Sequence, residues 1–256
     1  MAKKICIANR KGGVGKSTTA LALACGLAKK GKKVLMVDTD PQRNTTSVYG
    51  AKIEDTATLY DIFFSGISAK DCIQKTNLGD IIPSDDLLKN ADTQIDPNSF
   101  GRFKIIKKAL AEVENDYDYI IFDTPPLLGI LLNNVLMASD YIIIPCTCDK
   151  FGLQGMVDFY DTVKNAQEEN EKLKILGLLI IKYKGRQTLT KDLEDNLLPD
   201  YAKTMNTKVF KTRIRESVKC QESQILNKSI FEYAPNCNTA IDYMDLIKEI
   251  EKEIKK

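Results

Sequence analysis

A glycine-rich loop between a short apolar run and a helical segment constrains this chain more than any other feature. The apolar run is KICIAN at residues 4–9, the loop begins with RKGGVGKST at residue 10, and an Ala- and Leu-rich segment extends over residues 16–30. The glycines let the backbone curl so that its N–H groups face a polyphosphate, and a helix that starts directly afterwards adds the positive end of its dipole. This order of elements predicts the first unit of a parallel α/β sheet.

The loop contains residues that suit a nucleoside triphosphate with its magnesium ion. An ordinary phosphate-binding loop has the pattern G-x-x-x-x-G-K-[ST], and Gly15, Lys16 and Ser17 form its second half. Lys16 is placed to reach the β- and γ-phosphates, Ser17 to ligate Mg²⁺, and Thr18 to contact the α-phosphate. A glycine turn that only caps a helix is the alternative. The loop residues expected to bind ATP are Gly12, Gly13, Val14, Gly15, Lys16, Ser17 and Thr18.

Short runs rich in Ile and Val alternate with segments of helical period along the chain. Buried strands separated by helices predict a P-loop NTPase fold of the α/β class, a mostly parallel twisted sheet of about seven or eight strands with helices on both faces. No repeat or Gly/Ser linker divides the series, so we expect one domain over residues 1–256. The expected strands are 4–9, 33–38, 79–82, 118–123, 140–145, 174–182 and 207–210, and the expected helices are 16–30, 85–95, 99–115, 128–138, 153–170, 188–202, 216–225 and 238–254.

Two further motifs end strands of this sheet with carboxylates. The motif VDTDPQRN sets Asp38 and Asp40 two residues apart, so both side chains point the same way. One of the pair is expected to organise the water shell of Mg²⁺, and the other to orient or deprotonate the attacking water. The run YIIFDTPP places Asp123 at a strand end, where an aspartate holds Mg²⁺. The alternative for both motifs is a solvated turn.

The distribution of charge, cysteine and apolar residues limits the functions that fit this chain. The formal net charge is only +2, but residues 182–219 carry ten Lys/Arg and five Asp/Glu, which makes that stretch +5. Basic loops of this kind suit sequence-independent contacts to nucleic-acid phosphates, and a solvated charged face is the alternative. Seven cysteines and no histidine favour reduced thiols over disulfides or a zinc site. We expect no signal peptide, and no apolar stretch reaches the roughly 18 residues of a membrane helix.

Together, KGGVGKST, VDTDPQRN and YIIFDTPP resemble the deviant Walker A ATPases of the ParA/Soj partition family, and the resemblance runs nearly from end to end. It implies a Mg²⁺-dependent ATPase that forms an ATP-sandwich homodimer and binds double-stranded DNA without sequence preference. It also implies stimulation by a ParB-like centromere-binding protein, and a cytoplasmic, nucleoid-associated location without membrane binding.

The resemblance implies roles for individual residues by motif position. Lys11 matches the signature lysine that reaches the phosphates of the other subunit, Asp40 matches the hydrolytic aspartate, and Asp123 matches the Walker B residue. The expected catalytic residues are then Lys11, Lys16 and Asp40, with Lys11 also contacting ATP, and the expected metal residues are Ser17, Asp38 and Asp123. Lys16 already reaches the phosphates bound by its own loop, so a second lysine there is redundant in a monomer. In a dimer, that second lysine can contact the phosphates bound by the other subunit.

The resemblance also places four basic residues in or beside DNA-contacting segments, namely Arg186, Arg213, Arg215 and Lys219. The chain departs from the family pattern at Arg43, where a glycine is common, and at Arg215, where a proline is common beside the adenine. Because the first expected strand begins within four residues of Met1, we expect no N-terminal helix-turn-helix.

A MinD-like, membrane-cycling positioning ATPase of the same fold is the alternative function. The DPQ-N signature argues against it. So does the closing segment at residues 238–254, whose polar side mixes acids with lysines and predicts a helix packed on the body of the protein.

Overall fold

The computed structural model describes residues 1–183 and 197–255, without the side chains of residues 150–154. Within this part of the chain, seven strands form one sheet in the order β3-β4-β2-β5-β1-β6-β7. All neighbouring strands are parallel except β3, which pairs antiparallel with β4 at one edge. The strands are β1 Lys3–Ile7, β2 Val34–Asp38, β3 Gln74–Thr76, β4 Gly79–Ile82, β5 Tyr119–Asp123, β6 Tyr141–Cys146 and β7 Lys174–Ile180.

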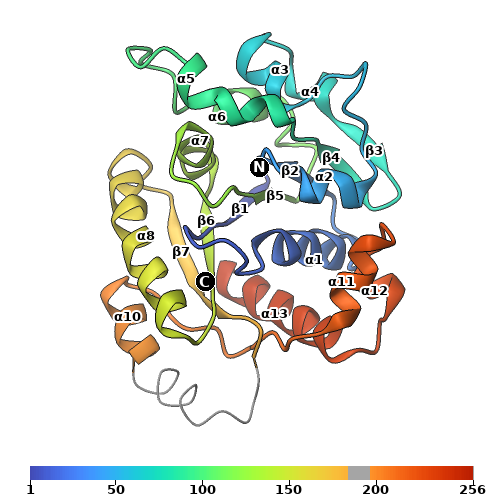
Figure 1. The fold of residues 1–256 in the computed structure, drawn as a ribbon, viewed down its shortest axis with the longest axis vertical. Coiled ribbons are helices and arrows are strands. Elements are labelled where there is room, and N and C mark those ends of the chain that lie inside the picture. The colour runs from blue at the N-terminus through green and yellow to red at the C-terminus, as the bar shows by residue number, and fades with distance from the viewer. Residues whose placement is uncertain (184–196, 256) are drawn as a thin grey trace.

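Helices cover both faces of this sheet (Figure 1), which confirms the predicted fold class. On one face lie α1 Lys16–Lys29, α12 Ile230–Tyr233 and α13 Asn238–Ile254. The other face carries α3 Leu59–Phe64, α4 Ala69–Cys72, the 3₁₀ helix η1 Asp86–Asn90, α5 Ala91–Gln94, α6 Ile105–Leu110, α7 Ile130–Ala138, α8 Lys150–Glu169 and α10 Leu198–Thr204. Two more helices, α2 Asn44–Tyr49 and α11 Val218–Ile225, lie near the ends of the strands.

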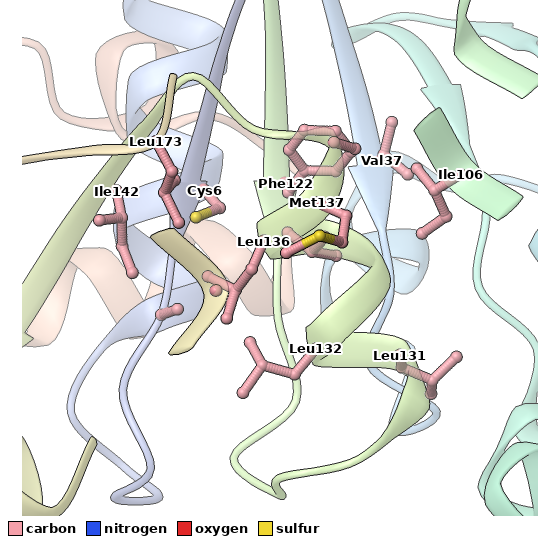
Figure 2. Close-up of a cluster of buried hydrophobic side chains, with 14 of the residues drawn as sticks. Cys6, Val37, Ile106, Phe122, Leu131, Leu132, Leu136, Met137, Ile142 and Leu173 are labelled. Atoms are coloured by element: carbon pink, nitrogen blue, oxygen red, sulfur yellow. The ribbon is translucent and has the colours of Figure 1, made fainter. Parts of the chain in front are cut away.

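Alternate side chains of each strand enter two separate cores, because successive residues of a strand point to opposite faces of the sheet. In β1, Cys6 joins the core under α7, and Ile5 joins the core under α1 and α13. Figure 2 shows Phe122 of β5 packed near Met137 of α7. Each fully buried apolar side chain of this kind stabilises the fold by about 1.5–3 kcal/mol, so the strands have to be apolar on both faces.

The prediction of a strand at residues 207–210 is wrong. Two backbone hydrogen bonds join this described segment to β7, from Leu178 N to the Lys208 carbonyl and from Phe210 N to the Leu178 carbonyl. The Phe210 ring covers Gly177, where an added Cβ would come within 2.6 Å of a ring carbon. The segment is therefore joined to β7 by one isolated bridge, between Leu178 and Val209, and not by a ladder long enough to form a strand.

Other differences concern short elements. The predicted helix at 99–115 is limited to α6 at Ile105–Leu110, and the predicted helix at 188–202 lies mostly outside the described residues, its end overlapping α10. Strand β3 and helices α2, α3, α4 and α12 were not predicted. These elements have three to six residues, which is too few for a hydrophobic period to be recognised.

The sequence motifs meet at the carboxyl ends of the central parallel strands. β1 leads into the glycine-rich loop, β2 ends at Asp38, and β5 ends at Asp123. The register pairs Asp123 with Ile7 on one side and with Asp38 on the other. This edge of an open α/β sheet is where ligands bind.

Candidate active site

The loop after β1 curls around the N-terminus of α1. Gly13 and Gly15 have φ angles of 71° and 66°, which residues with a side chain rarely adopt, and Gly15 is the N-cap of α1. A Cβ added to Gly12 or Gly13 would meet nothing within 4 Å, so open space lies directly beside the loop backbone. The free N–H groups at the start of a 14-residue helix and this open space together suit a phosphate chain.

A cavity of about 1000 Å³ opens beside this loop. Lys16, Ser17 and Thr18 line it on the side of α1, Asp40 lines it from the loop after β2, and Gln224 lines it from α11. The Gln224 amide donates a hydrogen bond to the Thr18 hydroxyl at 3.0 Å, which joins α11 to the start of α1. The volume is at the upper end of the range for small-molecule sites, and it is large enough for a nucleotide.

Lys16 lies inside this site. The residue is 7% exposed, and its ammonium group donates a hydrogen bond to the Lys11 carbonyl at 3.1 Å. Burial lowers the pKa of Lys16, while the nearby carboxylates of Asp123 and Asp40 raise it. A cation partly removed from water interacts more strongly with phosphate charge than an exposed one does.

Asp38 and Asp123 are fully buried and lie opposite each other on β2 and β5. Asp38 Oδ2 accepts hydrogen bonds from the Thr46 N–H at 2.8 Å and the Thr46 hydroxyl at 2.7 Å, and its Oδ1 accepts from the Asp40 N–H at 3.1 Å. Asp123 Oδ2 accepts from the Thr45 hydroxyl at 2.7 Å. Burial, followed by the charge of Asp123, raises the pKa of Asp38 to about 8, and burial raises the pKa of Asp123 to about 6.

One carboxylate oxygen of Asp123 accepts no hydrogen bond from the described residues. Asp123 Oδ1 is buried and lacks a hydrogen-bond partner within the described residues. Ser17 is close enough for hydrogen bonding to lower the pKa of Asp123, and the charge of Lys16 lowers it further. A free carboxylate oxygen beside a hydroxyl at a phosphate-binding loop is a donor set that fits Mg²⁺, which takes oxygen ligands and keeps several of its waters.

Asp40 starts the turn that leads from β2 into α2. The residue is 6% exposed and lines the cavity, and its Oδ1 accepts a hydrogen bond from the Gln42 N–H at 2.9 Å. Arg43, the N-cap of α2, has a φ of 57° in the left-handed region. A glycine adopts this conformation freely, whereas a residue with a side chain loses roughly 1–2 kcal/mol by adopting it. Arg43 therefore occupies a position that glycine would take without strain.

Lys11 lies on the solvent side of the loop. Its side chain is 32% exposed, and its ammonium group is 3.1 Å from Asp149 Oδ1. The Lys11 N–H donates to Asn9 Oδ1 at 3.0 Å, and the Asn9 amide donates to the Pro145 carbonyl at 2.8 Å, which ties the loop to β6. The two lysines of the loop therefore differ, with Lys16 buried in the site and Lys11 at its surface.

Comparisons with known proteins identify the family of this chain. A family described as an AAA domain matches residues 2–175. The sporulation initiation inhibitor protein Soj of Bacillus subtilis is 38% identical over 254 residues, which cover 98% of each chain. The chromosome-partitioning ATPase Soj of Treponema pallidum is 34% identical over 98% of this chain and 97% of its own. The chain belongs to the ParA/Soj family of partition ATPases.

One solved structure of a similar protein contains a nucleotide and magnesium. Cobyrinic acid a,c-diamide synthase of Mycobacterium smegmatis, with a bound ATP analogue and magnesium, is 26% identical and superposes with a TM-score of 0.85 over 100% of this chain and 96% of the other. With its family membership, this shows that the ParA/Soj-type chain is an ATPase whose cofactors are ATP and Mg²⁺. In the described ranges, no helix combines the length and the apolar character needed to cross a bilayer.

The basic residues that the ParA/Soj resemblance assigns to DNA have different surroundings. Arg186 lies outside the described residues. The exposed guanidinium of Arg213 lies 5.4 Å from the centroid of the Tyr183 ring. Lys219 is exposed, and its ammonium group is 2.8 Å from Glu222 Oε2. Arg213 and Lys219 therefore both have solvent-accessible charge at the segment that leads into α11.

Arg215 is engaged within the fold. Its Nε donates to both oxygens of Asp242 at 3.2 and 2.9 Å, and its Nη2 donates to Asp242 Oδ1 at 2.6 Å. Its backbone N–H donates to the same carboxylate at 3.0 Å. These bonds tie the loop before α11 to α13, so the residue that replaces the usual proline of the ParA/Soj pattern anchors this loop.

Sequence reasoning missed two threonines of the site. Thr45 and Thr46 lie at the start of α2, and their hydroxyls donate to Asp123 and Asp38 respectively. The sequence does contain a signal, since both threonines follow directly on DPQRN. A hydroxyl, however, can bond its own backbone, water or a distant acceptor, and the sequence does not show which.

Proposed function

We propose that this ParA/Soj-type ATPase is a nucleotide-switched homodimer that binds double-stranded DNA without sequence preference while ATP is bound. We further propose that a ParB-like centromere-binding protein stimulates its hydrolysis of ATP, and that residues 1–256 act as one ATPase domain, cytoplasmic and associated with the nucleoid. The observation that carries the proposal is the difference between the two loop lysines, Lys16 inside the site and Lys11 at its surface.

The hydrolytic roles follow from position. Lys16 and the N–H groups of the loop hold the phosphates, and Ser17 and Asp123 hold Mg²⁺, which neutralises phosphate charge. Asp38 lies opposite Asp123 at the end of β2, where it would help to organise the water shell of the metal. Asp40 lines the cavity with a carboxylate that orients the attacking water.

The surface around the site supports the proposed dimer. Lys11 is available to a facing copy once it leaves Asp149, and a cation brought from another subunit stabilises the charge that develops in phosphoryl transfer. Leu127 and Leu128, in the loop after β5, are 77% and 43% exposed, an apolar surface suited to a partner copy. In a two-fold dimer each Lys11 would reach the partner's nucleotide, so ATP would become part of the interface.

Exposed positive charge supports the proposed binding of DNA. Arg213 and Lys219 are exposed at one segment, Arg186 belongs to the same +5 stretch of sequence, and Arg215 takes part mainly by holding this segment in place. Phosphate contacts from lysine and arginine give affinity without base recognition.

The deciding experiment compares nucleotide states. Light scattering and binding to a random-sequence duplex are measured for the wild-type protein and for Lys11→Ala, each with ATP, with ADP and without nucleotide. We expect ATP to produce a dimer and tight DNA binding in the wild type only, with Lys11→Ala still binding ATP as a monomer. A Lys11→Ala protein that dimerises as well as wild type refutes the cross-subunit role of Lys11.

The MinD-like alternative is disfavoured by the closing helix. The apolar face of α13 is buried in the core against α1, with Tyr243, Leu246, Ile247 and Ile250 at most 2% exposed. The apolar face of this helix is therefore occupied by the protein core rather than free for a bilayer, with Ile241 exposed outside it. ATP-dependent binding to anionic vesicles would support the MinD-like function instead.

A further inference from the structure

Thr45 makes a buried hydrogen bond that no motif of the sequence predicts. Its hydroxyl donates to Asp123 Oδ2 at 2.7 Å, and the residue is 1% exposed. Thr45 lies in the first turn of α2, five residues after Asp40. One side chain thus connects the end of β5 to the segment that carries Asp40.

This bond determines which oxygen of Asp123 is available. The terminal torsion of an aspartate is soft, so a carboxylate without a fixed partner can present either oxygen. With Oδ2 bound to Thr45, the oxygen left over is Oδ1, which is buried and lacks a hydrogen-bond partner within the described residues. Ser17 and Lys16 lie near this carboxylate and lower its pKa. The carboxylate is therefore oriented before any cation arrives.

The neighbouring threonine does not duplicate this role. Thr46 donates through both its N–H and its hydroxyl to Asp38, and the Thr46 hydroxyl also accepts from the Ser84 N–H at 2.9 Å. Thr45 therefore donates to the carboxylate of Asp123 and Thr46 to that of Asp38, while the Thr39 hydroxyl donates to the Asp123 carbonyl rather than to its carboxylate.

We propose that Thr45 is a positioning residue for Mg²⁺, acting by holding Asp123 so that Oδ1 meets the metal's water shell. The proposal rests on the proposed function, which assigns Asp123 to the metal. Because Thr45 lies in the first turn of α2, the same bond also joins the start of that helix to the end of β5, in addition to the bond from the Thr39 hydroxyl to the Asp123 carbonyl. Partners that orient metal-holding carboxylates typically contribute about 10–100-fold to metal affinity.

The test measures ATP affinity with Mg²⁺ and with EDTA, using a fluorescent ATP analogue, and takes the ratio as the Mg²⁺ enhancement. Thr45→Val keeps the shape and removes the hydroxyl, and Thr45→Ser keeps the hydroxyl. We expect Thr45→Val to lose about 10–100-fold of the Mg²⁺ enhancement with affinity in EDTA unchanged, and Thr45→Ser to retain it. If Thr45→Val does not fold, Thr45→Ala is measured in its place.

Thr124→Val is the matched control. Its hydroxyl is also buried at this sheet edge, but it donates to the Ile7 carbonyl at 2.8 Å rather than to a carboxylate. We expect this variant to lose stability and to keep the wild-type Mg²⁺ enhancement. An equal loss in Thr45→Val and Thr124→Val would show a merely structural effect and overturn the proposal.

Asp123→Asn distinguishes a failure of the proposed metal role of Asp123 from a failure of the proposed role of Thr45. If Asp123→Asn keeps the wild-type Mg²⁺ enhancement, the metal role of Asp123 fails and the role of Thr45 fails with it. If Asp123→Asn loses the enhancement while the hydroxyl-free Thr45 variant keeps it, the proposal for Thr45 alone is wrong.

Discussion

Removing the ion pair between Arg215 and Asp242 tests whether Arg215 anchors its loop to α13 or contacts DNA directly. Asp242→Ala takes away the acceptor of three side-chain hydrogen bonds from Arg215 and of the Arg215 backbone N–H. The Asp242 side chain is 10% exposed and the Arg215 side chain is 43% exposed. The pair therefore lies between a surface ion pair and a buried one.

The magnitude follows from these contacts. A hydrogen bond to a charged group stabilises a protein by about 1.5–3 kcal/mol, and the partly exposed guanidinium reduces the coupling of this pair to about 1–2 kcal/mol. The backbone N–H left without its acceptor adds about 1 kcal/mol in Asp242→Ala. We expect Asp242→Ala to lower the free energy of unfolding by about 2–3 kcal/mol and Tm by about 4–12 °C, since each kcal/mol shifts Tm by about 2–4 °C at this size.

A double-mutant cycle provides the assay. Urea unfolding is measured for wild type, Asp242→Ala, Arg215→Ala and the double variant, and the coupling energy is the difference between the double effect and the sum of the single effects. A coupling energy below about 0.3 kcal/mol, within the additivity of independent sites, would refute the anchoring role of Arg215. A strong loss of DNA affinity in Arg215→Ala with unchanged stability would instead make Arg215 a direct phosphate contact.

Three further predictions concern the site and the surface. Asp40→Asn should keep ATP and Mg²⁺ binding and hydrolyse about 10²–10⁴-fold more slowly in a steady-state phosphate-release assay, and wild-type turnover would contradict its role. Lys219→Ala should weaken binding to any duplex and reduce the slope of log K against log salt by about 0.9, whereas the control Lys248→Ala, which removes an exposed i,i+3 ion pair on α13, should leave the slope unchanged. The pKa values of Asp38 and Asp123, about 8 and about 6, lie above the ordinary aspartate value of 3.8, so the native state binds more protons than the unfolded state over this range. The free energy of unfolding in EDTA should therefore fall as pH rises from about 4 to about 8, and Mg²⁺ with ATP should reduce the fall; urea unfolding that shows a rise in EDTA would contradict the shifts.

The sequence by itself determined the fold class and the sheet edge at which its motifs meet. Gly13 and Gly15 occupy left-handed positions, and Asp38 and Asp123 end apolar strands, so these features depend only on local backbone preference and on burial of both sheet faces. Parallel strands bring their carboxyl ends to one edge, which places the motifs together without any knowledge of side-chain contacts. The resemblance to partition ATPases rests on the same local motifs.

Only the tertiary structure decided which polar groups meet. Thr45 binds Asp123 across 78 residues of chain, and Arg215 binds Asp242 across 27. A hydroxyl or a guanidinium can bond many acceptors, so its partner depends on the packing of elements distant in sequence. The failure at residues 207–210 has the same cause, since Phe210 takes the space over Gly177 and only a short stretch of backbone pairs with β7. Local pattern therefore determined where the site lies, and packing decided how its side chains are held.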